Sequence, residues 1–187
     1  MSVLDNGNAV WFLMRGSGIV SLLLLTGVMA LGIATRGGVR LGSLPRFATL
    51  ALHRSISLLS VVFIAIHVAT AVIDPYASVR IVDVFVPFTA PSHPLLVGLG
   101  ALAVDLVLAL IVTGLLRERI GRRTWRAIHW AAYATWPVAF IHAIGMGSDT
   151  SSLWFRVLGI GSVAFIAGAV AWRGLLPSQR SSPVTAR

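Results

Sequence analysis

Long apolar stretches alternate with short polar segments along most of this chain. Five of the stretches have about the 20 residues that a helix needs to cross the hydrocarbon core of a bilayer. The pattern therefore predicts an all-α membrane protein built as a bundle of five transmembrane helices. These helices are expected at about residues 10–35, 50–73, 95–116, 127–147 and 153–172.

The polar segments differ sharply in charge. Residues 117–126, RERIGRRTWR, contain five arginines and one glutamate, and residues 36–49 contain three arginines. Residues 74–94 contain one arginine against two aspartates, and residues 148–152 contain only Asp149. Loops rich in Arg or Lys stay on the cytoplasmic side of a membrane. We therefore expect the N-terminus outside and the C-terminus in the cytoplasm.

Three segments outside the apolar stretches carry predictions of their own. Residues 74–94 are apolar with isolated charges and prolines, which predicts a short interfacial segment along the outer surface. Residues 173–187 are rich in Arg, Ser and Pro, which predicts a polar cytoplasmic tail after a transmembrane domain of residues 1–172. The leader MSVLDNGNAV has no basic residue, so we expect no signal peptide.

Composition agrees with a membrane protein and excludes several kinds of site. The chain is 57% hydrophobic and 11% charged, whereas soluble domains are about 25% charged. Cysteine is absent, which excludes disulfides and cysteine-bound iron–sulfur clusters. The net charge of +9 comes from arginines in the gaps between apolar stretches, so we expect a membrane-lipid environment and no nucleic-acid partner.

Four of the five histidines lie in only two of the predicted helices. His53 and His67 belong to the second, and His129 and His142 belong to the fourth. Both helices follow an arginine-rich segment and run in the same direction, so His53 and His129 share an inner level. Fourteen residues of helix rise about 21 Å and bring His53 and His67 to within about 40° of one face. The sequence thus predicts two histidine pairs at two depths.

The fourth helix fits this arrangement less simply. Thirteen residues separate His129 from His142, which leaves them about 140° out of phase in an ideal helix. Pro137 lies between them, and a proline inside a helix removes a hydrogen bond and bends the axis. We therefore expect the fourth helix to be distorted near Pro137.

Imidazole pairs in an apolar setting fit haem better than other metal centres. Haem iron takes two axial ligands, and neutral imidazole is a common one. Zinc requires four ligands around one point, which pairs at two depths do not provide. A lone membrane histidine is more often a helix–helix hydrogen-bond partner, but four at matched heights favour ligands. Arg54 and Arg126 lie beside the inner histidines and suit the haem propionates.

Three further polar residues have several open interpretations. Arg15 in the first helix could meet a propionate of the outer haem, form the wall of an acceptor pocket, or extend to the interface. Asp105 in the third helix could pair with Arg15, bond to a ligating histidine, carry protons or join two helices. His93 lies in the outer segment and is expected to be a loop residue, with a role near the outer haem as the alternative.

The histidine-bearing stretches also resemble a known family. LHRSISLLSVVFIAIH and RAIHWAAYATWPVAFIHAIG are similar to the ferric reductase-like transmembrane domain family, the membrane part of ferric reductases and NADPH oxidases. The resemblance covers about residues 10–172 and is greatest to short, membrane-only actinobacterial members. It implies two haem b groups, with iron ligated by His53 with His129 and by His67 with His142. It also implies electron transfer across a bacterial plasma membrane, usually outward.

One departure from the family pattern bears on the electron donor. Ferric reductases and NADPH oxidases carry a flavin and nicotinamide domain after the last helix, whereas a short tail follows Trp172 here. We therefore expect a separate cytoplasmic flavoprotein or a membrane quinol as donor. The acceptor would be ferric iron, oxygen or an extracytoplasmic redox partner. The alternatives are a quinone-linked cytochrome, such as a superoxide oxidase running electrons inward, and a haem-free transporter or assembly subunit.

Overall fold

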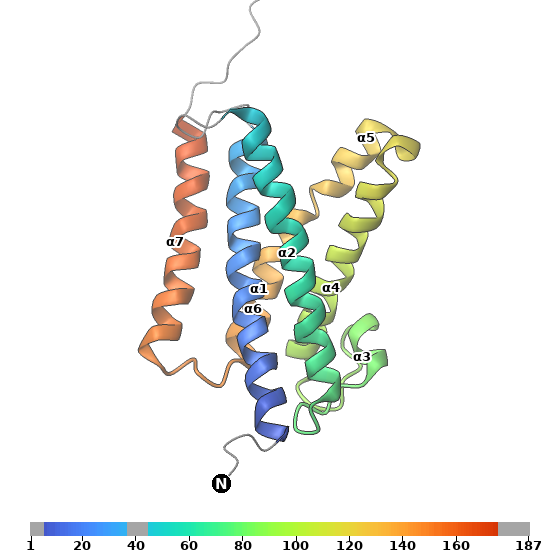
Figure 1. The fold of residues 1–187 in the computed structure, drawn as a ribbon, viewed down its shortest axis with the longest axis vertical. Helices are drawn as coiled ribbons and strands as arrows, with labels where there is room; N and C mark the ends of the chain where they lie inside the picture. The colour runs from blue at the N-terminus through green and yellow to red at the C-terminus, as the bar shows by residue number, and fades with distance from the viewer. Residues whose placement is uncertain (1–5, 37–44, 176–187) are drawn as a thin grey trace, which may run out of the picture.

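The computed structural model describes residues 6–36 and 45–175, which form seven α-helices and no strand (Figure 1). Residues 173–175 of the tail predicted at 173–187 belong to the last helix, and the rest of that tail lies outside the described residues, as do the leader before residue 6 and part of the first arginine-rich segment. The helices are α1 Asn6–Arg36, α2 Arg46–Ile73, α3 Ile81–Phe85, α4 Pro94–Leu115, α5 Arg117–His129, α6 Ala132–Met146 and α7 Leu153–Leu175.

Four of the described helices, α1, α2, α4 and α7, are long and apolar enough to cross a membrane. The remaining predicted stretch, 127–147, is divided between the end of α5 and α6. The 15 residues of α6 rise only about 22 Å, less than the roughly 30 Å of a hydrocarbon core. The prediction of an all-helical membrane protein is confirmed, and the fifth crossing and the orientation of the termini stay predictions.

Helix α1 occupies the centre of the packing. It contacts α2, α6 and α7, while α4 contacts α3, α5 and α6. A buried apolar cluster joins α1, α6 and α7 and contains Ala30, Ile33, Trp136 and Ile166. The indole N–H of Trp136 donates to the Thr26 hydroxyl at 2.8 Å, so its one polar atom is satisfied. This cluster holds α6 against α1 on the side that faces α7.

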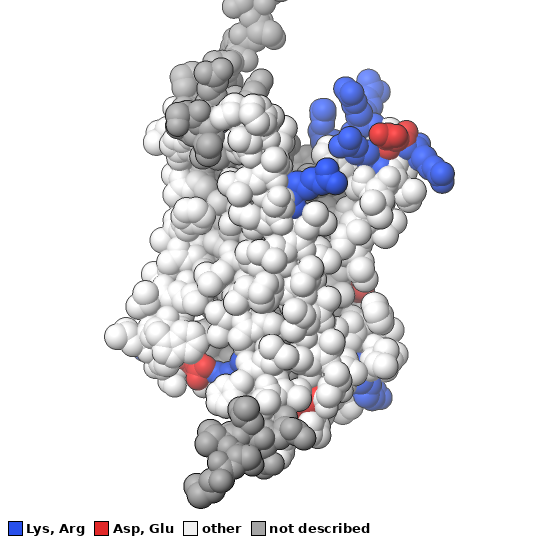
Figure 2. All heavy atoms as spheres, viewed as in Figure 1, with Lys and Arg blue, Asp and Glu red and all other residues white. Residues whose placement is uncertain are grey.

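Most charged side chains lie at the two ends of the bundle, and the surface between the ends is largely apolar (Figure 2). Arginines cluster around α5 at one end, here called the α5 end. The opposite end, near the start of α1, carries α3 and is called the α3 end (Figure 1). Many large apolar side chains between the ends are exposed, such as Leu58, Val112 and Phe165. Such a surface is suited to contact with lipid.

The arginine-rich segment 117–126 is helical, although the sequence predicted only a polar connection there. Helix α5 runs over Arg117–His129 and has no buried residue. Its backbone kinks at Gly121, where φ is 76°, a conformation that glycine adopts without steric cost. The segment is therefore a bent surface helix that leads back into the bundle.

The interfacial segment predicted at 74–94 contains the short helix α3, held by one buried carboxylate. Asp83 is 1% exposed and accepts hydrogen bonds from Arg80 Nε at 2.9 Å, Arg80 Nη2 at 2.6 Å and the Thr89 hydroxyl at 2.8 Å. The backbone N–H of Arg80 donates to it as well. The pKa of Asp83 lies well below its usual range, and the main reason is the hydrogen bonding from the Arg80 guanidinium.

Substituting Asp83→Asn is expected to loosen the segment around α3. The ionised carboxylate stabilises the fold at pH values above its unfolded pKa of about 4, and this stabilisation is lost as the pH falls through its lower folded pKa. The amide cannot accept the same charge-assisted bonds. Hydrogen exchange at residues 81–89 should therefore be faster in the variant at pH 7, whereas Glu118→Gln at the other end should leave it unchanged. Equal exchange rates in the Asp83 variant and wild type would contradict this.

Candidate functional site

Two of the four candidate histidines face each other between α2 and α6. The ring centres of His67 and His142 are 6.3 Å apart, and their planes cross at 75°. Two imidazole nitrogens that share one metal ion each lie about 2 Å from it, which sets the ring centres about 6 Å apart. The spacing of the His67–His142 pair therefore matches that of two ligands on opposite sides of one metal ion.

Hydrogen bonds fix the protonation of both rings. His67 Nδ1 donates to the carbonyl of Met14 at 2.8 Å, and His142 Nδ1 donates to the carbonyl of Leu96 at 2.7 Å. A carbonyl can only accept, so each Nδ1 must carry the hydrogen. In the neutral ring Nε2 then keeps its lone pair, and neither Nε2 forms a hydrogen bond with the described part of the chain. Nε2 of each histidine is thus available to coordinate a metal ion.

A mostly apolar cavity of about 280 Å³ adjoins the His67–His142 pair. Residues of α1, α2, α4 and α6 contribute most of its wall, with both histidines on it. Gly18 and Gly100 line it where the rings lie, and Asp83 and Arg15 line it as well. A flat, largely apolar macrocycle needs such surroundings, so the cavity and the ligand pair together fit haem.

The second pair, His53 and His129, lies toward the α5 end. His53 interacts electrostatically with His129 and lies near the Val28 carbonyl, but its buried Nδ1 has no hydrogen bond of ordinary geometry with the described residues. His129 is the last residue of α5, and its ring stacks on Trp125 with 4.8 Å between ring centres. The structure therefore brings the two inner histidines near each other, and His53 Nδ1 lacks the short carbonyl contact that His67 and His142 have.

A helix break lies between His129 and His142, but it does not lie at Pro137. The helix is interrupted at residues 130–131, where hydrogen bonds span three residues, as in Ala131 N–H to the Ile128 carbonyl at 2.8 Å. Helix α6 then runs through Pro137 without interruption. The expected distortion is present, but it immediately follows His129. The tighter turns rotate the chain more per residue than an α-helix does. The break therefore changes the angle between His129 and His142 about the helix axis.

Arg15 connects α1 to the loop between α6 and α7. Its guanidinium donates to the Ser148 hydroxyl and forms an ion pair with Asp149, and it lies 4.2 Å from the ring centre of Trp11. Pairing of Arg15 with Asp105 was one interpretation of the sequence, and the structure gives Arg15 a different partner. Asp105 has no hydrogen bond or ion pair with the described residues.

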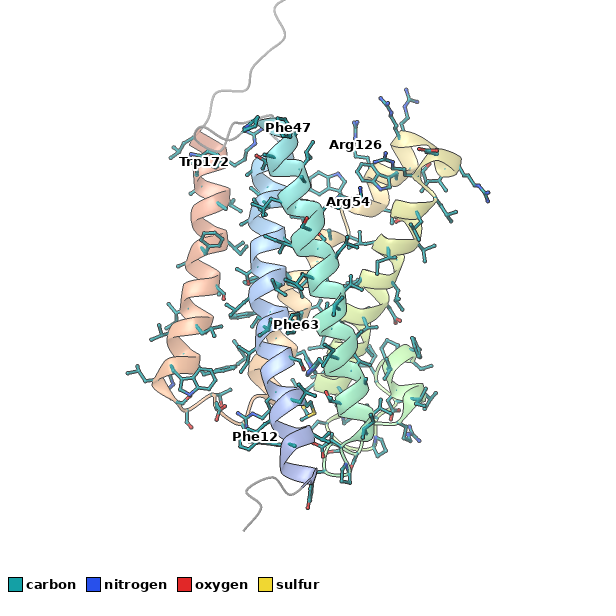
Figure 3. All side chains as sticks on the ribbon, in the orientation of Figure 1. Phe12, Phe47, Arg54, Phe63, Arg126 and Trp172 are labelled. Carbon is teal, nitrogen blue, oxygen red and sulfur yellow. The ribbon has the colours of Figure 1, made fainter. Side chains whose placement is uncertain are left out.

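The other candidate residues lie at the surface. Arg54 and Arg126 are exposed and lie at the α5 end (Figure 3). They are near the inner histidines in sequence, and no ion pair with the described residues holds either of them. His93 is exposed and serves as the residue before α4, with a left-handed backbone at φ 48°. Its position agrees with the loop role expected for it.

The contacts of three glycines with the histidines were not predicted from the sequence. A Cβ at Gly18 would lie 2.9 Å from His67 Nδ1, one at Gly100 would lie 2.7 Å from His142 Cε1, and one at Gly32 would lie 3.6 Å from His53 Cε1. Gly18 and Gly32 are fourteen residues apart, as are His53 and His67. That equal spacing on two neighbouring helices was the feature of the sequence that could have indicated these contacts.

Comparison with protein families gave one match. The model described as "Ferric reductase like transmembrane component" matches residues 17–140, well over half of the chain. The matched region contains His53, His67 and His129, and His142 follows two residues after its end. Comparisons with curated proteins and with solved structures found no match.

Proposed function

Because the chain belongs to the ferric reductase-like transmembrane family, we propose that it is a membrane cytochrome that carries electrons between the two membrane faces through two bis-histidine haem b groups. One observation carries the proposal. The His67–His142 rings have the spacing of two ligands of one metal ion, and both Nδ1 atoms donate to carbonyls, which leaves Nε2 for the metal. A haem-free transporter has no need of this arrangement.

The roles of the histidines follow from their positions. His67 with His142, and His53 with His129, would hold the two haem irons, and haem supplies a one-electron carrier at each level. The mostly apolar walls of the cavity beside His67 and His142 would lower the dielectric constant around the bound haem. The carbonyls of Met14 and Leu96 keep those two imidazoles in the tautomer that coordinates.

The arginines would act at the edges of the two sites. Arg54 and Arg126 are free of ion pairs with the described residues and lie at the α5 end, where they could bind propionates of the inner haem. Arg15 already binds Asp149 and Ser148. We therefore assign it to the wall of the cavity and to holding the loop between α6 and α7 against α1. These assignments rest on the exposure and the contacts of each guanidinium.

The orientation proposed for the bundle indicates which end meets the electron donor and which end meets the acceptor. The basic α5 end would face the cytoplasm and receive electrons from a separate flavoprotein or from quinol. The α3 end would face outward and pass them to ferric iron, oxygen or a redox partner. Reduction of an external dye by right-side-out vesicles, with the donor enclosed, would test this direction against inward flow.

A pyridine haemochrome assay on the purified full-length protein tests the central proposal. We expect two haem b groups per chain, because the structure contains two histidine pairs. A protein that binds no haem in membranes from haem-sufficient cells would refute the proposed function. One haem per chain would contradict the two-level arrangement.

A further inference from the structure

The rings of His67 and His142 occupy space beside Gly18 and Gly100 that a side chain at either glycine position would fill. A Cβ at Gly18 would come within 2.9 Å of the His67 ring, and a Cβ at Gly100 within 2.7 Å of the His142 ring. Non-bonded carbon contacts normally measure about 3.5–4.0 Å. Each ring therefore lies directly against the backbone of the neighbouring helix.

The carbonyl that each ring contacts lies four residues before the glycine. His67 Nδ1 bonds to Met14, four before Gly18, and His142 Nδ1 bonds to Leu96, four before Gly100. Residues four apart stack on the same face of a helix, with each Cβ tilted toward the preceding turn. A side chain at the glycine position would cover the carbonyl. We call this combination, a helix carbonyl with a glycine four residues later, a glycine notch.

The two notches lie on different helices. The Gly18 notch is on α1 and receives a histidine of α2, whereas the Gly100 notch is on α4 and receives a histidine of α6. Each ring is thus fixed by its own helix pair, and the two rings meet across the cavity at 75°. The angle between the ring planes is therefore set by two separate anchoring points, one for each ring.

We infer that Gly18 and Gly100 are positioning residues that hold His67 and His142 as Nδ1-protonated tautomers with crossed ring planes. The inference rests on the proposed function, since it assigns the cause of the ligand geometry at one of the two haem sites. Ligand orientation and hydrogen bonding at the outer nitrogen are two of the means by which a protein tunes haem iron.

The inner level has a similar but looser arrangement. Gly32 faces His53 and lies four residues after Val28, whose carbonyl is near the ring. Here a Cβ would be 3.6 Å from the ring, an ordinary contact, and Nδ1 is not hydrogen-bonded to the described residues. Gly32 therefore provides a matched control in the same helix as Gly18. Gly27, with no atom near its Cβ position, provides a second.

Electron paramagnetic resonance reads the angle between axial imidazole planes. Parallel planes split two iron d orbitals and give a rhombic low-spin signal, whereas crossed planes leave those orbitals nearly degenerate and give a highly anisotropic signal. In the oxidised wild-type protein we expect a highly anisotropic signal from the haem between His67 and His142. Its loss in His142→Ala assigns it to that site. A rhombic signal at that site would overturn the inference without the use of any glycine variant.

The glycine variants test the cause of that geometry. Gly18→Ala and Gly100→Ala should each shift or abolish the highly anisotropic signal and leave the signal of the inner haem. Gly32→Ala and Gly27→Ala should leave both signals as in wild type. If the first two variants bind both haems with unchanged spectra and midpoint potentials, the inference fails while the proposed function stands. Absence of haem from wild type would instead refute the proposed function, and the inference with it.

Discussion

The His142→Ala variant is expected to purify with one haem per chain instead of two. In the proposed haem site His142 Nε2 would be one of two protein ligands, and alanine offers no atom that can replace it. The remaining haem should be the inner one, because its proposed ligands, His53 on α2 and His129 at the end of α5, are both left unchanged. Electron transfer across the membrane should be lost, since one of the two carriers is missing.

Haem content by pyridine haemochrome and the reduced-minus-oxidised spectrum measure this result. His93→Ala is the matched control, because His93 is an exposed histidine that caps α4 and should have no effect on haem content. Two haems in the His142 variant would contradict the assignment of the ligand. Two haems in His93→Ala with one in His142→Ala would separate a ligand from a loop histidine in the same protein.

Filling the cavity should have an effect as large as removal of a ligand. Ala101 is 4% exposed and lines the cavity one residue after Gly100. Ala101→Phe adds a phenyl ring to a space of about 280 Å³, and forced overpacking of a core costs about 1–3 kcal/mol even without a bound group. We expect the variant to retain the inner haem and to lose the haem at His67 and His142, although both ligands are intact.

Ala109→Phe gives the control for this experiment. Ala109 is on the same helix but exposed, so a phenyl ring there should face lipid and leave two haems. Haem content and thermal unfolding in detergent should be measured for both variants. If Ala101→Phe retains two haems with an unchanged spectrum, the cavity is not where the macrocycle lies.

The helices were largely predictable because their causes are local. A stretch of apolar residues of the right length forms a helix in a membrane whatever its neighbours are, since its backbone must satisfy its own hydrogen bonds. The charge contrast between segments is equally local. Residues 117–126 were expected only as a charged gap between membrane segments, and the structure adds that they are helical, because an arginine-rich amphipathic segment can form a helix at a surface.

The partners of polar side chains were not predictable in the same way. Arg15 pairs with Asp149, which is 134 residues away in the sequence, and not with Asp105. The sequence offered Asp105 as a partner of Arg15 and gave Asp149 no such role. The choice depends on which loop the end of α1 approaches, and helix packing decides that.

The sequence by itself determined how far apart His53 and His67 lie along α2, because distance along an unbroken helix is a count of residues multiplied by a fixed rise. The tertiary structure decided which ring meets which, at what angle and in which tautomer. His67 contacts a carbonyl 53 residues away and His142 one 46 residues away, each exposed by a glycine on a neighbouring helix. Rotation about the helix axis and the distance between helices set these contacts, and both are properties of the packed bundle.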